Sequence, residues 1–380
     1  MSAALFLALV ACVAWVYLLL GRGGFWRTTL DPLPPPPARW PRVAAVVPAR
    51  DEAETIGRAI ASLLRQDYAG EFSVVLVDDA STDGTASRAR AAADQLGLGD
   101  RLRVVAAPPL ERGWTGKLWA LATGVREADA TSPELYLFTD ADIEHHPQNL
   151  TRLVTRLEGK GCDLASLMVK LHCASAAERF LIPAFVFFFA MLYPFAWASD
   201  PARRTAAAAG GCMLLRRSAY ERIGGLATIK GELIDDCALA RAVKRGGRIW
   251  LGLSGQTKSL RVYPRLADIW AMVARTAYTQ LNHSPLNLAG TVAGLGLVFL
   301  APVLVLPAGG APLWLGLASW AMMSAAYAPM LRFYGLSPLR APLLPVVALV
   351  YLAATADSAR RHWRGKGGEW KGRVSWQSQR

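Results

Sequence analysis

The feature that most constrains the fold is an alternation of apolar strand-like runs and helix-like segments between residues 42 and 142. Short runs rich in valine, leucine and alanine are typical of strands buried on both faces, and the segments between them carry apolar residues at helical spacing. The expected strands cover 42–50, 72–81, 102–108 and 134–142, and the expected helices cover 52–66, 82–96 and 117–128. This order predicts an α/β fold with a parallel-rich sheet and helices on both of its faces.

Beyond residue 150 the alternation is less regular. Residues 163–169 and 248–254 are further expected strands. The segment 180–198 is strongly apolar and aromatic. If it crossed a bilayer, the polar clusters before and after it would face opposite compartments and could not share a site. We therefore expect it to lie in the membrane interface or to form a lipid-facing wall.

Apolar stretches near both ends of the chain predict transmembrane helices. Hydrophobic residues make up 53% of the sequence, which is too apolar for an ordinary soluble protein of this size. The uncharged stretches 3–20, 289–306 and 313–331 are long enough to cross a bilayer, and 343–354 is a shorter candidate. The first stretch lacks a basic n-region and a cleavage site, which favours an uncleaved anchor over a signal peptide.

The positive charge of the chain is concentrated beside these apolar stretches. The net charge is +13, and much of it comes from Arg22, Arg27, Arg360, Arg361, Arg364, Lys366, Lys371 and Arg373. This distribution suits anionic lipid headgroups on the cytoplasmic side of a bacterial-type inner membrane. No motif in the soluble region indicates a nucleic-acid partner.

The five cysteines have no CxxC spacing, which is consistent with a reducing, cytosolic compartment for the soluble domain.

These patterns predict five regions. They are an anchor at 1–21, a proline-rich linker at 22–41, a catalytic domain with interfacial helices at 42–285, transmembrane helices at 286–357 and a basic tail at 358–380. Three later spans would place the basic tail on the side opposite the catalytic domain, against the positive-inside tendency. We therefore expect that 343–354 does not cross the membrane.

Two aspartates, Asp140 and Asp142, follow the fourth expected strand. Hard carboxylate oxygens at this spacing suit Mg²⁺ or Mn²⁺ held jointly with a phosphate, although aspartate is also common in simple turns. In open α/β sheets ligands bind beyond the carboxyl ends of the strands, which favours the functional interpretation. His145 and His146 could extend such a site, but paired histidines on a turn are more often structural.

Polar residues also follow the first two expected strands. Asp78 and Asp79 could accept hydrogen bonds from a base or a ribose, or could cap the next helix. The segment Pro48-Ala49-Arg50-Asp51-Glu52 leads into a helix N-terminus, which favours anions. Glu52 could instead simply complement the helix dipole.

Two further motifs carry charged side chains at helix starts. In "GWTGK" (113–117), backbone amides and Lys117 could contact a diphosphate, although the P-loop spacing is absent. Asp235 and Asp236 begin an amphipathic helix. Close carboxylates raise one pKa of the pair, which suits a proton acceptor, whereas helix capping is the structural alternative.

Taken together, six short motifs resemble, in order, those of the family 2 inverting glycosyltransferases of GT-A fold. The motifs are "VVPARDE", "VDDASTDGT", "GWTGK", "FTDADI", "GGCMLLRRSAYERIGG" and "IDDCALA". The later apolar spans and "GEWKGR" (368–373) resemble lipid-directed members, and more narrowly the hopanoid biosynthesis-associated glycosyltransferases.

The resemblance implies a role for each matching residue. It implies that the nucleotide sugar, expected to be a UDP-sugar, is held by Pro48, Ala49, Arg50, Glu52, Asp78, Asp79, Lys117 and Asp140. It implies that Asp140 and Asp142 bind the metal, and that Asp236, beside Asp235, is the catalytic base. Gly210 and Gly211 would line the site of a lipid acceptor.

One departure from the family pattern affects the expected product. Many relatives carry a Gln-x-x-Arg-Trp motif after the base, whereas this chain reads "ARTAYTQLNHS" (274–284). Arg275 could replace the arginine at the acceptor site, but the tryptophan is missing. This favours transfer of a single sugar over polymer synthesis. The alternatives are a ceramide- or carotenoid-type glycosyltransferase and a membrane nucleotide-binding scaffold without turnover.

Overall fold

The computed structural model describes residues 1–29, 32–365, 369–370 and 373–374. Its internal contacts divide the chain into two compact units. Unit 1 comprises Met1–Thr29, Cys173–Ala196 and Val262–Gly368, and unit 2 comprises Leu30–His172, Trp197–Arg261 and Glu369–Arg380. Part of the expected tail motif "GEWKGR", with Lys366 and Lys371, lies outside the described residues.

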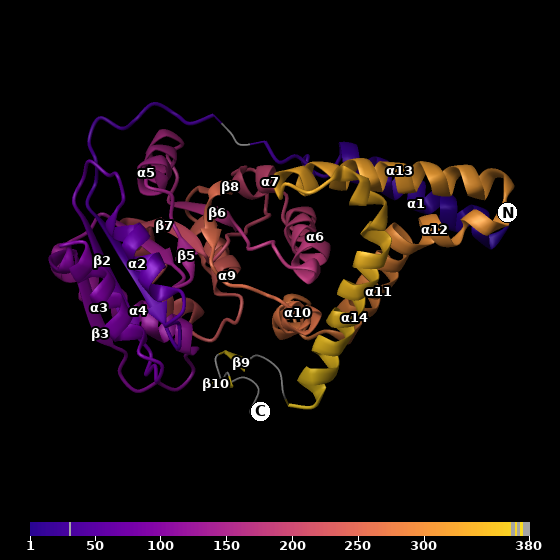
Figure 1. The fold of residues 1–380 in the computed structure, drawn as a ribbon. Helices are drawn as coiled ribbons and strands as arrows, with labels where there is room; N and C mark the ends of the chain where they lie inside the picture. Colours follow the sequence, from indigo (N-terminus) through magenta and orange to yellow (C-terminus); the bar gives the residue numbers. More distant parts are fainter. Residues whose placement is uncertain (30–31, 366–368, 371–372, 375–380) are drawn as a thin grey trace. The chain divides into compact units, whose positions relative to one another are not determined.

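Unit 2 is built on a sheet (Figure 1). Within the described residues, eight strands form it in the order β3-β2-β1-β4-β7-β6-β8-β5. The strands are β1 (Val43–Ala49), β2 (Phe72–Asp78), β3 (Leu102–Ala106), β4 (Leu135–Thr139), β5 (Ile143–Glu144), β6 (Leu164–Lys170), β7 (Cys212–Arg216) and β8 (Ile249–Ser259). The short strands β9 (Glu369–Trp370) and β10 (Arg373–Val374) form a separate antiparallel pair.

The strand directions confirm the predicted fold class and add antiparallel members to the sheet. β1 runs parallel to β2 and β4, and β2 runs parallel to β3. β7 is antiparallel to both β4 and β6, and β5 is antiparallel to β8. Neither β5 nor β7 is among the strands expected from the sequence. The result is a GT-A-like α/β fold with a mixed sheet.

Helices cover both faces of this sheet, as predicted. One apolar core joins the odd-numbered residues of β1, such as Val43 and Val47, to α2, α3 and α5. The other core joins Ala44 and Val46 to α4, α8 and α9. The helices are α2 (Ile56–Leu64), α3 (Thr85–Gln95), α4 (Gly116–Ala128), α5 (Asn149–Gly159), α8 (Arg217–Arg222) and α9 (Asp235–Lys244). The two faces fit the alternation of side chains along a strand.

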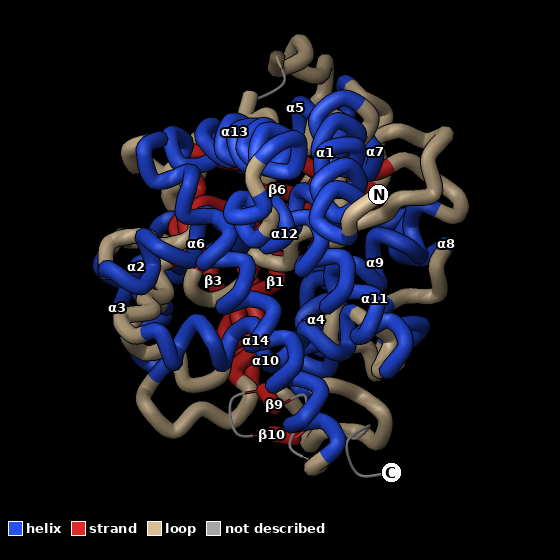
Figure 2. The backbone as a smooth tube through the Cα atoms, turned by 90° about the vertical axis from the view of Figure 1, so that its right-hand side faces the viewer, coloured by secondary structure: helices blue, strands red, loops and turns tan. Residues whose placement is uncertain are grey.

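Unit 1 is formed by helices. They are α1 (Ala3–Leu20), α6 (Ala176–Leu192), α10 (Leu266–Gln280), α11 (Pro285–Leu295), α12 (Ala301–Leu304), α13 (Gly310–Phe333) and α14 (Leu344–Trp363). The residues of the short helix α7 (Phe195–Ser199) are divided between the two units after Ala196. Figures 1 and 2 both place α1 beside α13 and α10 beside α14, in agreement with their contacts. The helices α1, α6 and α11 each begin after a serine whose hydroxyl oxygen accepts a hydrogen bond from a backbone N–H group of the first turn. These serines are Ser2, Ser175 and Ser284.

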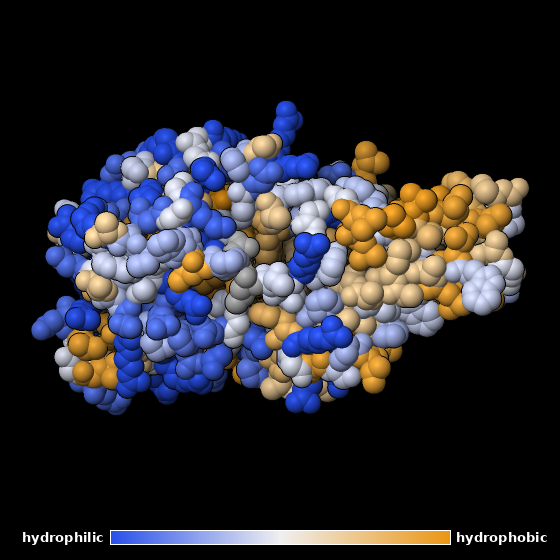
Figure 3. All heavy atoms as spheres, turned by 90° about the horizontal axis from the view of Figure 1, so that it is seen from above, coloured by the Kyte–Doolittle hydropathy of each residue, from blue (hydrophilic) through white to orange (hydrophobic). Residues whose placement is uncertain are grey.

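Large hydrophobic side chains remain exposed on these helices, and Figure 3 shows such side chains gathered over them. They include Phe6, Val13, Leu20, Leu286, Leu304, Trp314, Val346 and Leu349. Among the residues that the structure describes, three stretches are long and apolar enough to cross a membrane, namely Ala3–Leu20, Pro285–Leu304 and Pro338–Trp363. Exposed apolar surface on helices of this length is what a bilayer would cover.

The membrane-type helices differ in part from the expected spans. The expected span 313–331 lies in the 24-residue helix α13, which is not among the three candidate stretches. The segment 343–354, which we expected not to cross, lies inside the candidate stretch Pro338–Trp363. A 3-10 helix at Pro338–Leu343 precedes α14, and α14 continues to Trp363. The aromatic segment at 180–198 is largely helix α6, which contacts α10, α13 and α14 within unit 1.

Candidate functional site

Lys117 brings two distant carboxylates together. It lies in the first turn of α4, which Thr115 caps by accepting a hydrogen bond from the N–H of Leu118. Its Nζ atom lies 2.9 Å from Oδ1 of Asp140 and 3.2 Å from Oδ2 of Asp235. The acid that follows β4 and the acid that begins α9 therefore share one ammonium group, as expected if the carboxyl end of the sheet forms a site.

Asp236 is held beside this group by backbone donors. Its Oδ2 atom accepts a hydrogen bond from the N–H of Gly210 at 2.9 Å, and Oδ1 accepts one from the N–H of Cys237 at 2.7 Å. A Cβ atom placed on Gly210 would lie 3.2 Å from Nζ of Lys117 and 3.4 Å from Oδ2 of Asp236. Glycine at position 210 therefore lets the backbone approach both charged groups.

The electrostatics of this cluster favour a proton acceptor at Asp236. Burial and repulsion by Asp235 raise its pKa to about 6, against the attraction of Lys117. Burial lowers the pKa of Lys117, but Asp140, Asp235 and Asp236 more than offset this, so the net shift is upward. Lys117 therefore stays charged at neutral pH while Asp236 can exchange a proton near neutrality.

The exits of β1 and β2 form a second part of the site. Ala49 lies opposite Asp78 in the parallel register, and the carbonyl of Ala49 accepts the N–H of Asp79 at 2.8 Å. Pro48 precedes Ala49 within β1. The guanidinium of Arg50 donates to the carbonyl of Asp79 at 2.5 Å and lies 3.8 Å from its Oδ2 atom. Residues predicted to hold the nucleoside thus gather at one edge of the sheet.

The acidic pair at 78–79 could have capped the next helix, but Asp83 serves that helix instead. Asp83 accepts hydrogen bonds from the N–H groups of Thr85 and Ala53 and so serves the start of α3. Asp78 accepts the N–H of Ser81 at 3.0 Å, which closes the turn after β2. Asp79 is 2% exposed, and the N-cap of α3 is Gly84.

Asp142 follows β4 at the carboxyl end of the sheet, and residues that the sequence analysis missed bind its side chain. Its Oδ2 atom accepts hydrogen bonds from Nε of Arg261 at 2.9 Å and from the hydroxyl of Ser259 at 3.2 Å. A second nitrogen of Arg261 donates to Oε1 of Glu52 at 2.5 Å. The expected strand ended at residue 254, but β8 continues to Ser259, so Arg261 lies just beyond a strand end.

The donor set fits a divalent metal only if a ligand completes it. Within the described ranges, no three His, Cys, Asp or Glu side chains surround one point that could hold a metal ion. Asp140 and Asp142 supply hard oxygens, and the Asp140 side chain is 36% exposed. Mg²⁺ commonly binds through one or two carboxylates together with substrate phosphates. The two aspartates therefore fit an ion that a diphosphate brings or shares.

His145 is a structural residue and does not extend a metal site. One ring nitrogen, Nδ1, lies 2.9 Å from the amide nitrogen of Asn149, and Nε2 lies 2.9 Å from the hydroxyl of Thr139. The Thr139 hydroxyl lies 2.9 Å from the carbonyl of Gly211 and donates to it. Because Asn149 donates to Nδ1, Nε2 carries the proton and donates to Thr139. Burial lowers the pKa of His145 to about 3, so the ring is neutral.

The remaining predicted residues lie in different places. Gly211 is part of the network just described, and a Cβ atom there would lie 3.2 Å from Val169. Arg275 lies on α10 in unit 1, where its side chain is exposed.

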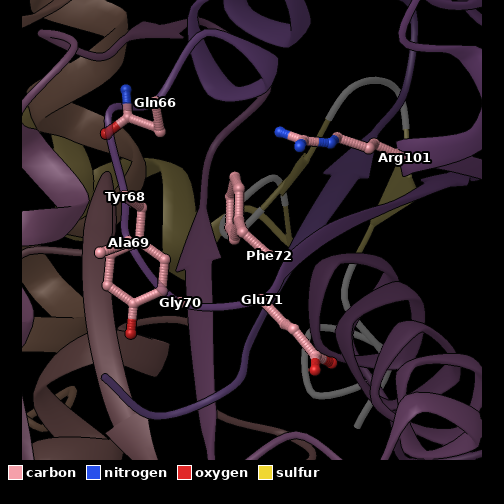
Figure 4. A pocket seen from close by; sticks show the side chains of 7 residues that line it. All are labelled: Gln66, Tyr68, Ala69, Gly70, Glu71, Phe72 and Arg101. Atoms are coloured by element: carbon pink, nitrogen blue, oxygen red, sulfur yellow. The ribbon is translucent and has the colours of Figure 1, made fainter. Parts of the chain in front are cut away.

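A cavity of about 390 Å³ lies at the end of the sheet where β2 begins, away from the carboxyl ends of β1, β2 and β4 (Figure 4). It is lined by Gln66, Tyr68, Ala69, Gly70, Glu71, Phe72 and Arg101. Phe72 begins β2, whereas Asp78 ends it. The cavity is therefore separate from the acidic cluster.

Comparison with known proteins agrees with the fold. Residues 44–224, just under half of the chain, match the model of the family described as Glycosyl transferase family 2. The solved structure of a mannosyltransferase from Pyrobaculum calidifontis, in complex with GDP-Man and Mn²⁺, superposes with a TM-score of 0.57 at 23% identity. The match covers 94% of this chain and 99% of that one. It supports the GT-A-like architecture.

Two curated relatives match over shorter stretches. Glycosyltransferase AglE of Haloferax volcanii is 30% identical over 144 residues, which is 37% of this chain and 44% of that protein. Dodecaprenyl-phosphate galacturonate synthase of Rhizobium johnstonii is 29% identical over 144 residues, which is 36% of this chain and 39% of that protein. The chain thus spans less than half the length of either relative.

Proposed function

Because residues 44–224 form a family 2 glycosyltransferase domain, we propose that the chain is a membrane-bound inverting glycosyltransferase. It moves one sugar from a nucleotide sugar to the hydroxyl group of a lipid. The catalytic domain faces the cytoplasm at the inner membrane. The acceptor belongs to hopanoid or related glycolipid biosynthesis.

One observation carries this proposal. Lys117 contacts Asp140, in the predicted diphosphate and metal site, and Asp235, beside the predicted base. A nucleotide scaffold without turnover would not need a carboxyl group with a raised pKa beside its phosphate site. The raised pKa of Asp236, about 6, therefore supports an enzyme.

The chemistry follows from the positions of these side chains. The oxygen of the acceptor hydroxyl attacks the anomeric carbon from the side opposite the diphosphate, and the bond from that carbon to the phosphate oxygen breaks. Asp236 takes the hydroxyl proton, and Gly210 keeps the carboxylate oriented through its N–H group. Lys117 places a positive charge where negative charge develops on the departing diphosphate. A divalent cation held by Asp140, Asp142 and the diphosphate would supply further neutralisation of that charge.

The donor is expected to be a UDP-sugar, with Asp78, Asp79 and Arg50 around its nucleoside. The acidic edge after β2 offers acceptors for base or ribose donors, and Asp79 lies almost fully buried there. The neighbouring solved structure holds GDP-Man, so a GDP-sugar is the donor to test beside UDP-sugars.

A lipid acceptor is supported by the apolar helices of unit 1 and by one relative named for dodecaprenyl phosphate. Arg275 on the exposed side of α10 would contact such an acceptor. Ceramides and the hydroxylated members of the hopanoids and carotenoids offer hydroxyl groups, and acceptor profiling separates them.

A donor and acceptor screen tests the proposal. The full chain is purified in detergent with Mn²⁺ or Mg²⁺ and mixed with radiolabelled UDP- and GDP-sugars and with defined lipids, including a hydroxylated hopanoid and a ceramide. We expect label in the lipid phase with one nucleotide-sugar class and a metal requirement that EDTA reveals. Nucleotide binding without labelled product from any acceptor would favour the scaffold instead.

A further inference from the structure

Arg261 binds the carboxylate of Asp142, one of the two aspartates proposed to hold the metal ion. Its guanidinium joins the residue that follows β4 to Glu52, in the segment after β1, at distances of 2.9 and 2.5 Å. Glu52 and Asp142 are 209 and 119 positions away from Arg261 in the sequence. The contact therefore depends on the fold of the whole sheet.

The backbone around Arg261 fixes this arrangement. The N–H of Leu260 donates to the carbonyl of Asp142 at 2.7 Å, and the N–H of Arg261 donates to the hydroxyl of Ser259 at 3.2 Å. Ser259 in turn donates to the same Asp142 oxygen as Arg261. Asp142 is only 7% exposed, so its charge depends on these donors for compensation.

A metal ion bound to Asp142 would share with Arg261 a carboxylate that Arg261 already compensates. Two carboxylates, Glu52 and Asp142, face one guanidinium, and a divalent ion on Asp142 would replace the compensation that Arg261 provides. A guanidinium is also well shaped to bind a phosphate with two parallel hydrogen bonds. A diphosphate in the site would therefore give Arg261 a new partner and leave Asp142 to the metal.

We propose that Arg261 is a built-in counter-cation that competes with the divalent metal for Asp142 and transfers to the donor's diphosphate when the donor binds. This inference rests on the proposed function. Its consequence is cooperative binding, in which the metal binds weakly alone and tightly with nucleotide. Reciprocal coupling of this kind typically changes affinity by about 5- to 150-fold.

The test measures Mn²⁺ binding without turnover. The amplitude of the free Mn²⁺ signal in electron paramagnetic resonance gives the dissociation constant for the purified full chain, with and without UDP or GDP. We expect nucleotide to tighten Mn²⁺ binding in the wild type by at least about fivefold. In Arg261→Gln, Mn²⁺ alone should bind more tightly by a similar factor, and nucleotide should add little.

Two further variants make the result specific. Arg58→Gln is the charge-matched control, since it also removes one positive charge from an arginine. Arg58 pairs with Glu144 at 3.1 Å and does not touch Asp142. It should bind Mn²⁺ as the wild type does. Arg261→Lys keeps the charge but loses the planar fork of donors that joins Asp142 to Glu52, so it should give intermediate coupling. It serves if the glutamine variant does not fold.

The outcomes separate this inference from the proposed function. Wild-type protein that binds neither Mn²⁺ nor nucleotide contradicts both. Wild-type protein that binds both, with Arg261→Gln indistinguishable from Arg58→Gln, overturns the counter-cation role alone.

Discussion

The pKa of Asp236 links proton transfer to solution pH. A base must be deprotonated to act, and burial and Asp235 raise the pKa of Asp236 to about 6. We therefore expect kcat/KM to fall as the pH drops below about 6. In Asp235→Asn the repulsion disappears, so the acidic limb of the pH profile should move to lower pH. A pH–rate profile of both proteins checks this, and an unmoved limb would contradict the assignment of Asp236.

His145 gives a second prediction at the scale of one residue. Its folded-state pKa of about 3 lies below its usual value of 6.5, so the unfolded chain binds the proton more readily. Stability should therefore be lost as the pH falls from about 6.5 towards 3, at up to about 1.4 kcal/mol per pH unit.

Thermal unfolding followed by circular dichroism between pH 4 and 7 measures this loss. His145→Gln should show a shallower dependence of Tm on pH than the wild type, whereas His146→Gln, at the half-exposed neighbouring position, should retain the wild-type dependence. Identical slopes in all three proteins would show that His145 does not contribute.

Some site residues could be predicted from sequence and others could not. Asp140, Asp142 and Asp236 follow strand ends or begin a helix, and such positions are visible in a local pattern. Arg261 is one of many arginines, and its contact with Glu52 exists only because the sheet brings their strands' ends together. No local pattern around Arg261 indicates this contact.

At the scale of elements, α4 depends on one glycine for its distance from the sheet. A Cβ atom on Gly124 would lie 2.3 Å from Cγ1 of Val46 and 2.9 Å from Cγ2 of Val77. We expect Gly124→Ala to lower the free energy of unfolding by about 1–3 kcal/mol, because β1 and β2 must shift.

Gly57→Ala in α2 is the matched control. A Cβ atom there meets nothing within 4 Å, so alanine should stabilise that helix by up to about 1 kcal/mol. Thermal unfolding of both variants gives the comparison. A neutral Gly124→Ala variant would mean that α4 lies farther from β1 than in this structure.

The elements themselves divide into those with local signals and those without. Expected strands at 42–50 and 72–81 correspond to β1 and β2, since their valine-rich runs are continuous. β7 was missed because "CMLLR" is short and follows an alanine- and glycine-rich run without a turn pattern. Its antiparallel pairing with β4 is a long-range contact that sequence periodicity does not encode.

At the scale of the whole molecule, membrane association should be integral. In the described part of the chain, three stretches meet the length and hydropathy of a span, and exposed side chains such as Val13 and Leu304 would face lipid. After cell fractionation we expect the chain to remain in the membrane pellet in alkaline carbonate and to dissolve in detergent. Release by carbonate would contradict membrane-spanning segments.

Composition predicted apolar helices near both ends of the chain. It did not predict which helices belong to each of the two compact units. α6 and α10 group with the helices of unit 1 through contacts between residues far apart in sequence. The expected catalytic domain at 42–285 included the residues of α10, and its grouping with unit 1 follows from its contacts with α14 and α6.

The central claim is that Asp236 removes the acceptor proton in a site that binds the nucleotide through other residues. Sugar transfer and nucleotide binding measured together on Asp236→Asn test it most directly, with Asp100→Asn, at an exposed position, as the matched control. We expect nucleotide affinity close to that of the wild type and transfer reduced by about 10²- to 10⁴-fold, because a positioned base contributes that much. Transfer at the wild-type rate in Asp236→Asn would contradict the account.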